Sequence, residues 1–530
     1  MLKGTLDFET DPFKIDRIPA PFASCIYFGE NDNLVIWSKK CAKKTFDEIS
    51  KLPACELYAH NGGKFDFWFL LQWVENQDVK IINGRIAKIK IGKCTLIDSY
   101  LLIAEPLDRY QKTVINYEKM EREVRNSHKS EIIKYMVDDC KFLLELVNGF
   151  HEILGKKLTI GGAAMASAKA QGVDVIKQGK SHDEIFRRYY YGGRVEALKR
   201  GSIKFDKDCP GYLLDINSAY PFAMVHGHPH GKQYIRSKTL PKNRKDGAWF
   251  AVVVAISRGA LPVRLKSGEL KFPRDGKIRT YRATGWEINA GLETKTLEIL
   301  EVRHVLRPKK KINFKKFVLY HYRERQAAKA KKDKLGDLVH KKAMNSGYGK
   351  LASNPEKFFD WVIAEPGLNV EEYEGGNGYE WYNDIQGQSL WRKPATEEAK
   401  EQGYYDVATG ASITGFVRAM LWRALRSVSG AYYCDTDSIF CSEPGKAELS
   451  DKVLGTWKTE MRVKNLFIAG KKIYAAKGTE GEEKLACKGA RLSYEEIKQL
   501  TLTGKMNWEN IAPTFSISRG IFFVKRDLIT

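Results

Sequence analysis

The sequence predicts a multidomain protein of mixed α/β and α+β class. Its 530 residues are enough for roughly three or four domains, each with its own core. Residues 1–100 alternate short strand-like runs with turn residues, and residues 128–155 then show helical periodicity, which together predict one α/β domain. Glycine-rich stretches and an apolar strand at 211–214 follow, so we place the start of a second domain near residue 156.

The charge balance predicts a polyanionic partner. Lysine and arginine number 88 against 65 aspartates and glutamates, a formal net charge of +23. A hydrophobic content of 43% excludes a wholly disordered basic tail. We find no targeting peptide and no apolar run long enough to span a membrane. The nine scattered cysteines have no zinc spacing, so we expect a reducing, cytoplasmic compartment and no structural zinc.

Two segments depart from the average charge. Residues 307–334 are rich in lysine and arginine and in good helix formers, and a solvated helix face explains them as well as a binding surface does. Residues 353–405 hold eleven acids against four bases, a net charge of −7. An element that lies against DNA needs positive charge, whereas this segment is negative. We therefore expect part of it to face solvent or a basic protein.

Carboxylates occur at metal-binding spacing in the first 140 residues. Asp7 and Glu9 lie at i and i+2 of a strand and so share one face, although a D-x-E triplet alone is weak and fits a surface strand equally well. Asp66 follows a glycine pair within the run 60–66. Tyr135 and Asp139 are four residues apart on a helix. Four acids and one phenol can therefore converge.

These segments, in this order, resemble the D-x-E, N-x-x-x-F-D and Y-x-x-x-D motifs of proofreading 3′–5′ exonuclease domains. The resemblance implies that the four acids bind two divalent ions and that Tyr135 orients the attacking water. Oxygen-only ligands suit Mg²⁺ or Mn²⁺. Thr10, Asn61 and Phe65 match positions that hold the single-stranded end, and Lys112 more loosely matches a lysine of protein-primed polymerases.

A second set of acids lies further along the chain. Asp215 ends an apolar strand, and Asp435 and Asp437 stand at i and i+2 of an expected hairpin. Between them, Lys341, Asn345 and Tyr348 would form one stripe of a helix, whose alternative interpretation is a solvated polar face. The three segments resemble motifs A (D-x-x-S-x-Y-P), B (K-x-x-x-N-S-x-Y-G) and C (Y-x-D-T-D-S) of family B DNA polymerases.

Two shorter matches narrow the resemblance. Residues 190–193 match the Y-x-G-G linker between exonuclease and polymerase modules, and Lys472 with Tyr474 matches the K-x-Y motif that grips the primer strand. Together with the short chain and long spacers around motif B, they resemble the protein-primed subgroup of phages, viruses and linear plasmids. In that subgroup a terminal protein supplies the first hydroxyl.

The resemblance implies a role for each matching residue. Asp215 and Asp437 would bind two catalytic Mg²⁺ or Mn²⁺ ions, with the Ile216 carbonyl as a further ligand and Asp435 as support near the primer end. Lys341 would meet the incoming dNTP, with Arg325 or Lys329 as a second phosphate contact that the sequence leaves open. The other expected contacts are Ser218, Tyr220, Asn345 and Tyr348 for the dNTP, and Tyr190, Gly192, Gly193, Thr436, Lys472 and Tyr474 for DNA.

The resemblance also implies an RNase H-like exonuclease domain joined to a right-hand polymerase with two insertions. The expected boundaries are 1–155 for the exonuclease, 156–228 for the first part of the palm with motif A, 229–314 for an insertion like terminal-protein region 1, 315–352 for the fingers, 353–405 for an acidic insertion like terminal-protein region 2, 406–484 for the second part of the palm and 485–530 for the thumb.

The expected function is therefore DNA-directed DNA synthesis with 3′–5′ proofreading, protein priming and strand displacement. The partners would be DNA, dNTPs and a terminal protein, with no membrane and a monomeric chain. Two alternatives remain open: a family B polymerase that uses a nucleic-acid primer or none, and a catalytically inert DNA-binding scaffold. Seven acids retained at the motif positions argue against the scaffold.

Overall fold

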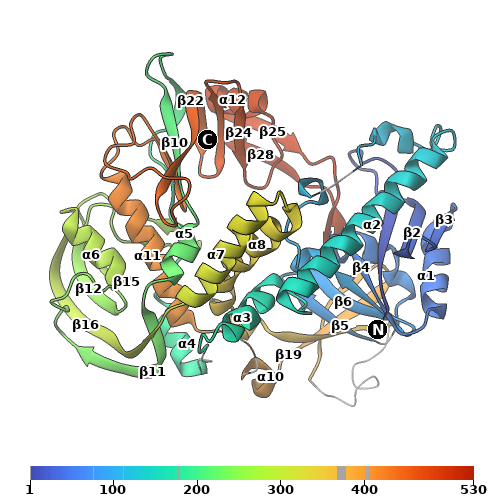
Figure 1. The fold of residues 1–530 in the computed structure, drawn as a ribbon, viewed down its shortest axis with the longest axis horizontal. Coiled ribbons are helices and arrows are strands. Elements are labelled where there is room, and N and C mark those ends of the chain that lie inside the picture. Colours follow the sequence, from blue (N-terminus) through green and yellow to red (C-terminus); the bar gives the residue numbers. More distant parts are fainter. Residues whose placement is uncertain are drawn as a thin grey trace.

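The computed structural model describes residues 2–75, 77–110, 113–175, 179–366, 378–401, 403 and 405–529. Two large sheets organise these residues, one built around the N-terminal strands and one in the second half of the chain (Figure 1). Helices α7 and α8 lie between the two parts in this view. Both expected carboxylate sites therefore have a sheet of their own.

The N-terminal sheet has ten strands in the order β18-β19-β17-β5-β6-β7-β4-β1-β2-β3. Its central strands β1, β4 and β7 pair in parallel, and β2 and β6 flank them in antiparallel pairing. β6 alternates buried and exposed residues, as a strand with one solvated face does. The elements of this part are β1 (Leu2–Thr10), β2 (Pro21–Gly29), β3 (Asp32–Trp37), α1 (Cys41–Lys51), β4 (Cys55–Ala59), β5 (Gln77–Ile82), β6 (Arg85–Ile91), β7 (Cys94–Asp98) and α2 (Lys129–Leu154).

The acidic segment belongs to this same sheet, which the sequence did not predict. Strand β17 (Phe359–Ala364) pairs with β5, with Trp361 opposite Val79. Its last four residues are buried, so the apolar run inside the acidic segment is a core strand. Charge counting over 353–405 did not detect it. The same segment holds β18 (Glu380–Ile385), β19 (Gln388–Pro394) and α10 (Glu397–Glu401).

The second sheet has the order β24-β23-β22-β10-β21-β20-β8, and β9 also pairs with β22. Strand β10 lies between β21 and β22, so motif A and the motif C hairpin are direct neighbours. The strands are β8 (Val195–Ala197), β9 (Gly201–Lys204), β10 (Gly211–Ile216), β20 (Tyr433–Asp435), β21 (Ser438–Cys441), β22 (Trp457–Gly470), β23 (Ile473–Gly478) and β24 (Glu483–Cys487).

The segment between motifs A and B forms a third, four-stranded sheet in the order β11-β16-β12-β15. Helix α6 follows β15 and starts with a capping box between Thr284 and Glu287. The elements are β11 (His228–Ser237), β12 (Phe250–Ser257), β13 (Val263–Arg264), β14 (Leu270–Lys271), β15 (Ile278–Thr284), α6 (Gly285–Glu293) and β16 (Leu297–Ile312).

The remaining helices connect the sheets. Asp333 caps α8 by accepting from the Gly336 amide at 2.9 Å, and Asp406 caps α11 by accepting from the Thr409 amide at 3.0 Å. Helix α8 contacts α2 of the N-terminal part (Figure 1). These helices are α3 (Ile160–Ala170), α4 (Lys180–Arg187), α5 (Ala219–Met224), α7 (Lys315–Ala330), α8 (Lys334–Leu351) and α11 (Val407–Leu425).

The C-terminal segment returns to the N-terminal sheet. The Phe515 ring contacts Phe65 and Trp68 at centroid distances of 5.4 and 5.6 Å, and Asn383 of β18 donates to the Ile517 carbonyl at 3.0 Å. Two ends of the chain thus share one apolar cluster. The segment holds α12 (Tyr494–Thr503), β25 (Lys505–Glu509), β26 (Thr514–Ser516), β27 (Gly520–Phe522) and β28 (Lys525–Ile529).

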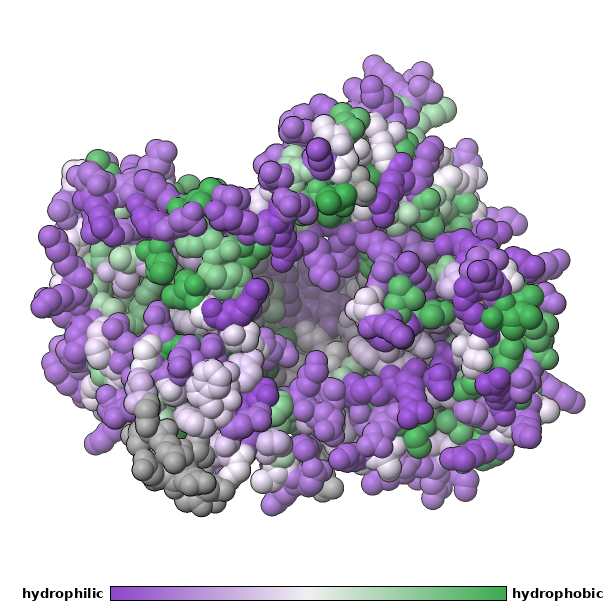
Figure 2. All heavy atoms as spheres, turned by 180° about the vertical axis from the view of Figure 1, so that it is seen from behind, coloured by the Kyte–Doolittle hydropathy of each residue, from purple (hydrophilic) through white to green (hydrophobic). Residues whose placement is uncertain are grey.

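The surface is largely hydrophilic in the rear view, and it is hollowed near the centre of the molecule (Figure 2). Among the residues that the structure describes, no helix is long and apolar enough to cross a bilayer.

The pairing of β17 with β5 generates a first prediction. Ile363→Ala truncates a fully buried side chain, which should lower the free energy of unfolding by about 2–5 kcal/mol. Because β17 supports β5, amide hydrogen exchange in residues 77–82 should accelerate at least about ten-fold. Leu449→Ala, at an exposed position, is the control. Unchanged exchange in residues 77–82 would show that the two strands are independent.

Candidate active sites

The first cluster of acids forms where β1, the turn after β4 and helix α2 meet. Asp7 and Glu9 project from β1, Asp66 begins the 3₁₀ turn Asp66–Phe69, and Asp139 comes from α2. The Phe8 amide donates to Asp66 Oδ1 at 3.2 Å, which fixes that turn against β1. The structure thus brings together all four acids of the predicted exonuclease site.

Each of these acids makes ionisation of the others less favourable. Burial raises the pKa of Asp7 well above its usual range, and the charges of Glu9, Asp66 and Asp139 raise it further. Burial also raises the pKa of Asp66, to about 7. Glu9, Asp66 and Asp139 are all less than 10% exposed. A cluster of this kind needs a cation, or protons, to stay together.

Tyr135 stands beside the acids. Burial and the charge of Glu9 raise the pKa of its phenol, so the hydroxyl keeps its proton at neutral pH. Its oxygen lies 3.1 Å from the Tyr117 hydroxyl, a partner that the sequence did not predict. The phenol is therefore held as a neutral hydrogen-bonding group next to the carboxylates.

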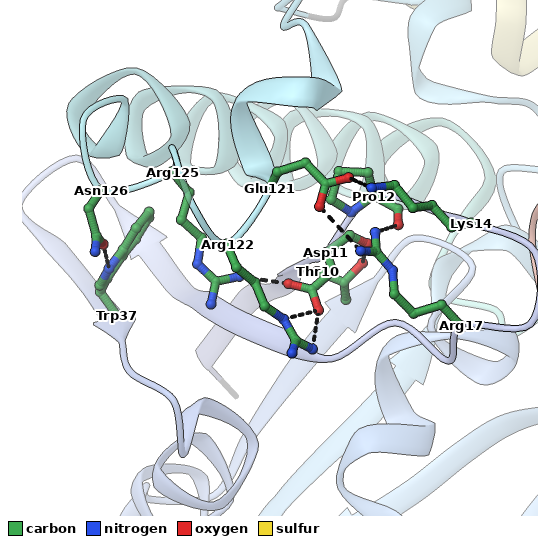
Figure 3. A network of polar contacts seen from close by, with 10 residues as sticks. All are labelled: Thr10, Asp11, Pro12, Lys14, Arg17, Trp37, Glu121, Arg122, Arg125 and Asn126. Carbon is green, nitrogen blue, oxygen red and sulfur yellow. Dashed lines mark hydrogen bonds and ion pairs between the residues drawn. The ribbon is translucent and has the colours of Figure 1, made fainter.

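A network of charged side chains closes the end of β1 (Figure 3). Buried Asp11 accepts from Arg122 and Arg125, in both cases at 2.7 Å, and Glu121 pairs with Lys14 at 2.5 Å and Arg17 at 3.2 Å. The network joins residues 11–17 to residues 121–125, directly after Thr10. In the sequence these charged residues look like an ordinary solvated surface. The charge pattern alone therefore could not predict the network.

The expected contacts for a single strand lie beside this cluster. Asn61 has a left-handed backbone (φ 66°), and Arg85 donates to its Oδ1 at 2.7 Å and to buried Asp98 at 2.6 Å. Phe65 packs edge-on against Phe13 and Phe515. Arg85 and Asp98 were missed because an ion pair across two strands leaves no local signal. Lys112 lies outside the described residues.

The second cluster forms at the edge shared by β10 and the motif C hairpin. Asp215 on β10 is in register with Ser438, and the Ile216 amide donates to the Asp437 carbonyl at 2.8 Å. These pairings place Asp215, Asp435 and Asp437 around one point. The hairpin that the sequence predicted for Asp435 and Asp437 is formed by β20 and β21.

The electrostatics resemble those of the first cluster. Burial raises the pKa of Asp437 to about 7, with further contributions from Asp215 and Asp435. Two lysines offset this charge: Lys458 lies 3.1 Å from Asp215, and Lys472 lies 2.6 Å from Asp435. Among the described residues, no group of three Asp, Glu, His or Cys side chains already has a metal-holding arrangement.

The tip of the hairpin is strained and closely packed. Thr436, a β-branched residue, has φ 59°, and its amide donates to the Arg194 carbonyl at 2.7 Å. A Cβ on Gly193 would meet Thr436 Oγ1 at 2.5 Å. The Y-x-G-G segment therefore needs glycine at its last position because the turn before Asp437 leaves no space.

The expected nucleotide residues come from α5, α7 and α8. The rings of Tyr220 and Tyr348 stack at 3.9 Å and 8°. Burial lowers the pKa of Lys341, and the charge of Arg325 lowers it further, which places Arg325 near Lys341. Lys329 is exposed.

The other expected contacts are placed as follows. Asn345 is exposed on α8, and Ser218 precedes α5 with φ 55°. Tyr474 is buried against Tyr433 and Phe440, while Lys472 ion-pairs with Asp435. Tyr190 and Gly192 are half-buried in the segment before β8.

One buried ion pair near this site was not predicted. Arg418 of α11 donates to Glu287 at 2.8 Å and to the Gly192 carbonyl at 2.9 Å, and both charged side chains are nearly fully buried. It thereby ties α6 and the Y-x-G-G segment to α11. The available signal was a lone arginine in the otherwise uncharged stretch 410–422, because a buried charge needs a partner.

The donor sets of both clusters fit divalent cations. Each gathers carboxylate oxygens whose pKa values are raised first by burial and then by the charges of the neighbouring acids, and a cation would offset both effects. In the second cluster, Lys458 and Lys472 contact two of the acids and would have to release them. Oxygen-only ligands are those preferred by Mg²⁺ and Mn²⁺.

Comparison with known proteins shows the family of the chain. Residues 107–406 match the family described as DNA polymerase type B, organellar and viral. The chain is 34% identical to the DNA-directed DNA polymerase of Enterobacteria phage PRD1, covering 99% of this chain and 97% of that protein. It is 22% identical to a probable DNA polymerase of Agaricus bitorquis, covering 92% and 75%.

Solved structures share the fold. Phi29 DNA polymerase complexed with primer-template DNA and incoming nucleotides matches with a TM-score of 0.71 at 18% identity, covering 100% of this chain and 99% of that one. Its complex with single-stranded DNA matches with a TM-score of 0.72 at 19% identity, covering 99% of each chain. The predicted fold class, an exonuclease domain joined to a right-hand polymerase, is confirmed.

The family match and the relatives together define a DNA polymerase. The chain belongs to the type B DNA polymerases of the organellar and viral kind. The predicted membership of the family B DNA polymerases is thereby confirmed.

The close contact at Gly193 generates a second prediction. Gly193→Ala should reduce primer extension at least about ten-fold, because the added Cβ displaces the turn that carries Asp437. Steady-state extension measures the effect, with Gly29→Ala as the control, since a Cβ there has nothing within 4 Å. Extension within about two-fold of the parent would contradict the steric requirement.

Proposed function

We propose that this polymerase copies DNA at the cluster of Asp215, Asp435 and Asp437 and removes nucleotides from a single-stranded 3′ end at the N-terminal cluster. The observation that supports this proposal is the presence of two carboxylate clusters on two different sheets, each with acids that repel one another. One polymerase needs only one such cluster for extension, so the other is available for proofreading.

At the N-terminal cluster, Asp7, Glu9, Asp66 and Asp139 would hold two Mg²⁺ or Mn²⁺ ions. When bound, such ions lower the pKa of water and stabilise the leaving oxygen. Tyr135, whose phenol stays protonated, orients the attacking water. Thr10, Asn61 and Phe65 hold the single strand; the Asn61 oxygen accepts from Arg85, so the amide nitrogen is the group left to donate to DNA.

At the second cluster, Asp215, Asp437 and the Ile216 carbonyl would hold two ions beside the primer 3′-OH, with Asp435 as support. Lys341 contacts the triphosphate. Arg325 is the better candidate for the second phosphate contact, because its charge influences Lys341 and Lys329 is exposed. Asn345 and Ser218 line the nucleotide site, and the Tyr220 ring, stacked on Tyr348, lies under the sugar and excludes a 2′-OH.

The remaining contacts are with DNA and with a protein primer. The path of the primer and template is lined by Tyr190, Gly192, Gly193, Thr436, Lys472 and Tyr474. When DNA binds, Lys472 leaves Asp435 and contacts a primer phosphate instead. A terminal protein supplies the first hydroxyl, and the monomeric polymerase works in the host cytoplasm. The formal net charge of +23 supports a polyanionic substrate.

Substitution at each cluster tests whether the two sites are separate. Asp437→Asn should reduce primer extension more than about a thousand-fold and leave single-strand degradation within about two-fold, because a metal ligand is lost at one cluster alone. Asp66→Asn should do the reverse. Both activities are measured with labelled oligonucleotides. Loss of both activities in either variant would contradict two separate sites.

Protein priming has its own test. The polymerase is incubated with a candidate terminal protein and labelled dNTP, and we expect label that stays covalently attached to protein on denaturing gels. Asp437→Asn, which lacks the metal ligand, should give no labelled protein and serves as the control. Extension of DNA primers with no label on any terminal protein would favour a nucleic-acid primer instead.

A further inference from the structure

The tip of the motif C hairpin is held by a residue outside the hairpin. The Thr436 amide donates to the Arg194 carbonyl at 2.7 Å, and the next residue along the chain is Asp437. Arg194 comes directly before β8, the edge strand that places Val195 opposite Asp435. Because β8 spans only 3 residues, few backbone hydrogen bonds hold it in the sheet. The position of the Arg194 carbonyl therefore depends on what holds the rest of that residue.

The Arg194 side chain is fully buried, which charged side chains almost never are unless they are paired. Its guanidinium lies over two aromatic rings, 4.0 Å from the centroid of Phe272 and 4.3 Å from that of Trp422. Both distances are within the range of a cation–π contact. The rings therefore stabilise the charge and restrict the tilt of the planar group.

Hydrogen bonds fix the remaining direction of this guanidinium. Its Nη1 donates to the Gly259 carbonyl at 2.8 Å, its Nε donates to Glu196 Oε2 at 2.5 Å, and its Nη2 pairs with the same oxygen. Glu196 is held in turn by Arg274, at 2.6 Å from Oε1 and 3.2 Å from Oε2. The buried charge of Arg194 thus has both a carboxylate and a carbonyl acceptor, as a buried charge requires.

Most of the residues that hold this side chain lie far away in sequence. Gly259, Phe272 and Arg274 belong to the segment between motifs A and B. Trp422 belongs to α11. The packing around them is close, because a Cβ on Gly259 would meet the Trp422 ring at 2.9 Å. The side chain therefore joins the tip of the motif C hairpin to two well-packed parts of the molecule.

We infer that Arg194 is a positioning residue for the polymerase carboxylates: its buried side chain fixes the carbonyl that holds Thr436, and so fixes the turn that presents Asp437. Arg194 acts through the backbone of the hairpin tip and not by contact with an ion. The inference rests on the proposed function, in which Asp437 binds a cation. It gives the segment between motifs A and B a part in the geometry of the polymerase site.

Mn²⁺ binding, measured by electron paramagnetic resonance on the metal-free protein, tests this inference. Asp7→Ala and Glu9→Ala are present in every variant, so that only ions of the second cluster are counted. Arg194→Met leaves Glu196 paired with Arg274 and should weaken Mn²⁺ binding about ten-fold, as the loss of a contact that supports metal ligands does. Arg194→Lys keeps the charge without the planar fork and should weaken binding about three-fold.

Controls separate this effect from general damage. Arg423→Met removes an arginine of α11 from a half-exposed pair with Glu293 and should leave Mn²⁺ binding unchanged. With Asp7 and Glu9 restored, single-strand degradation should stay within about two-fold of the parent in each variant, because that cluster lies on another sheet. Arg194→Lys decides the question if Arg194→Met does not fold.

Primer extension gives a second readout. The Mg²⁺ concentration for half-maximal extension should rise about ten-fold in Arg194→Met and about three-fold in Arg194→Lys. A residue that only stabilised the fold would lower the amount of active polymerase without changing this concentration. Lower extension at an unchanged Mg²⁺ requirement, together with unchanged Mn²⁺ binding, would therefore overturn the inference.

Asp437→Asn separates this inference from the proposed function. In the Mn²⁺ measurement it should weaken binding more than Arg194→Met does, because it changes the ligand itself. Unchanged Mn²⁺ binding in Asp437→Asn would contradict the proposed polymerase site. Weaker binding in Asp437→Asn, with unchanged binding in the folded Arg194 variants, would contradict only the positioning role.

Discussion

Repulsion between like-charged carboxylates is the constraint on which both sites depend. Two unit charges about 4 Å apart interact by about 1 kcal/mol in water and by several times more near a protein surface. Burial raises the pKa values of Asp7 and Asp437, and repulsion from the neighbouring acids raises them further. The chain holds such groups together because strand and turn geometry, not side-chain choice, sets their positions.

The supporting structure lies mostly far away in sequence. Strand β17 extends the N-terminal sheet, and Phe515 closes its aromatic cluster from the C-terminal segment. Beside the second sheet, Arg418 of α11 holds the Y-x-G-G segment through the Gly192 carbonyl, and Gly193 leaves space for Thr436. Each cluster is thus held by segments from several parts of the chain, so the N-terminal sheet depends structurally on segments that follow much later in the sequence.

Local spacing predicted the parts of each site that one strand, hairpin or helix supplies. Asp7 with Glu9, Asp435 with Asp437 and Tyr135 with Asp139 lie on the expected elements. Pairings between distant residues were not predictable, because periodicity carries no information about which strand lies next to which. The strand 359–364 in the acidic segment and the pair of Arg418 with Glu287 are examples.

Binding of Mn²⁺, counted by electron paramagnetic resonance on the metal-free protein, tests most directly whether each carboxylate cluster is a separate cation site. The parent should bind ions at both clusters. Removing Asp7 and Glu9 together should eliminate the ions of one cluster, and removing Asp215 and Asp437 those of the other, with the remaining binding unchanged. Loss of all binding in either variant, or no loss in both, would contradict two independent sites.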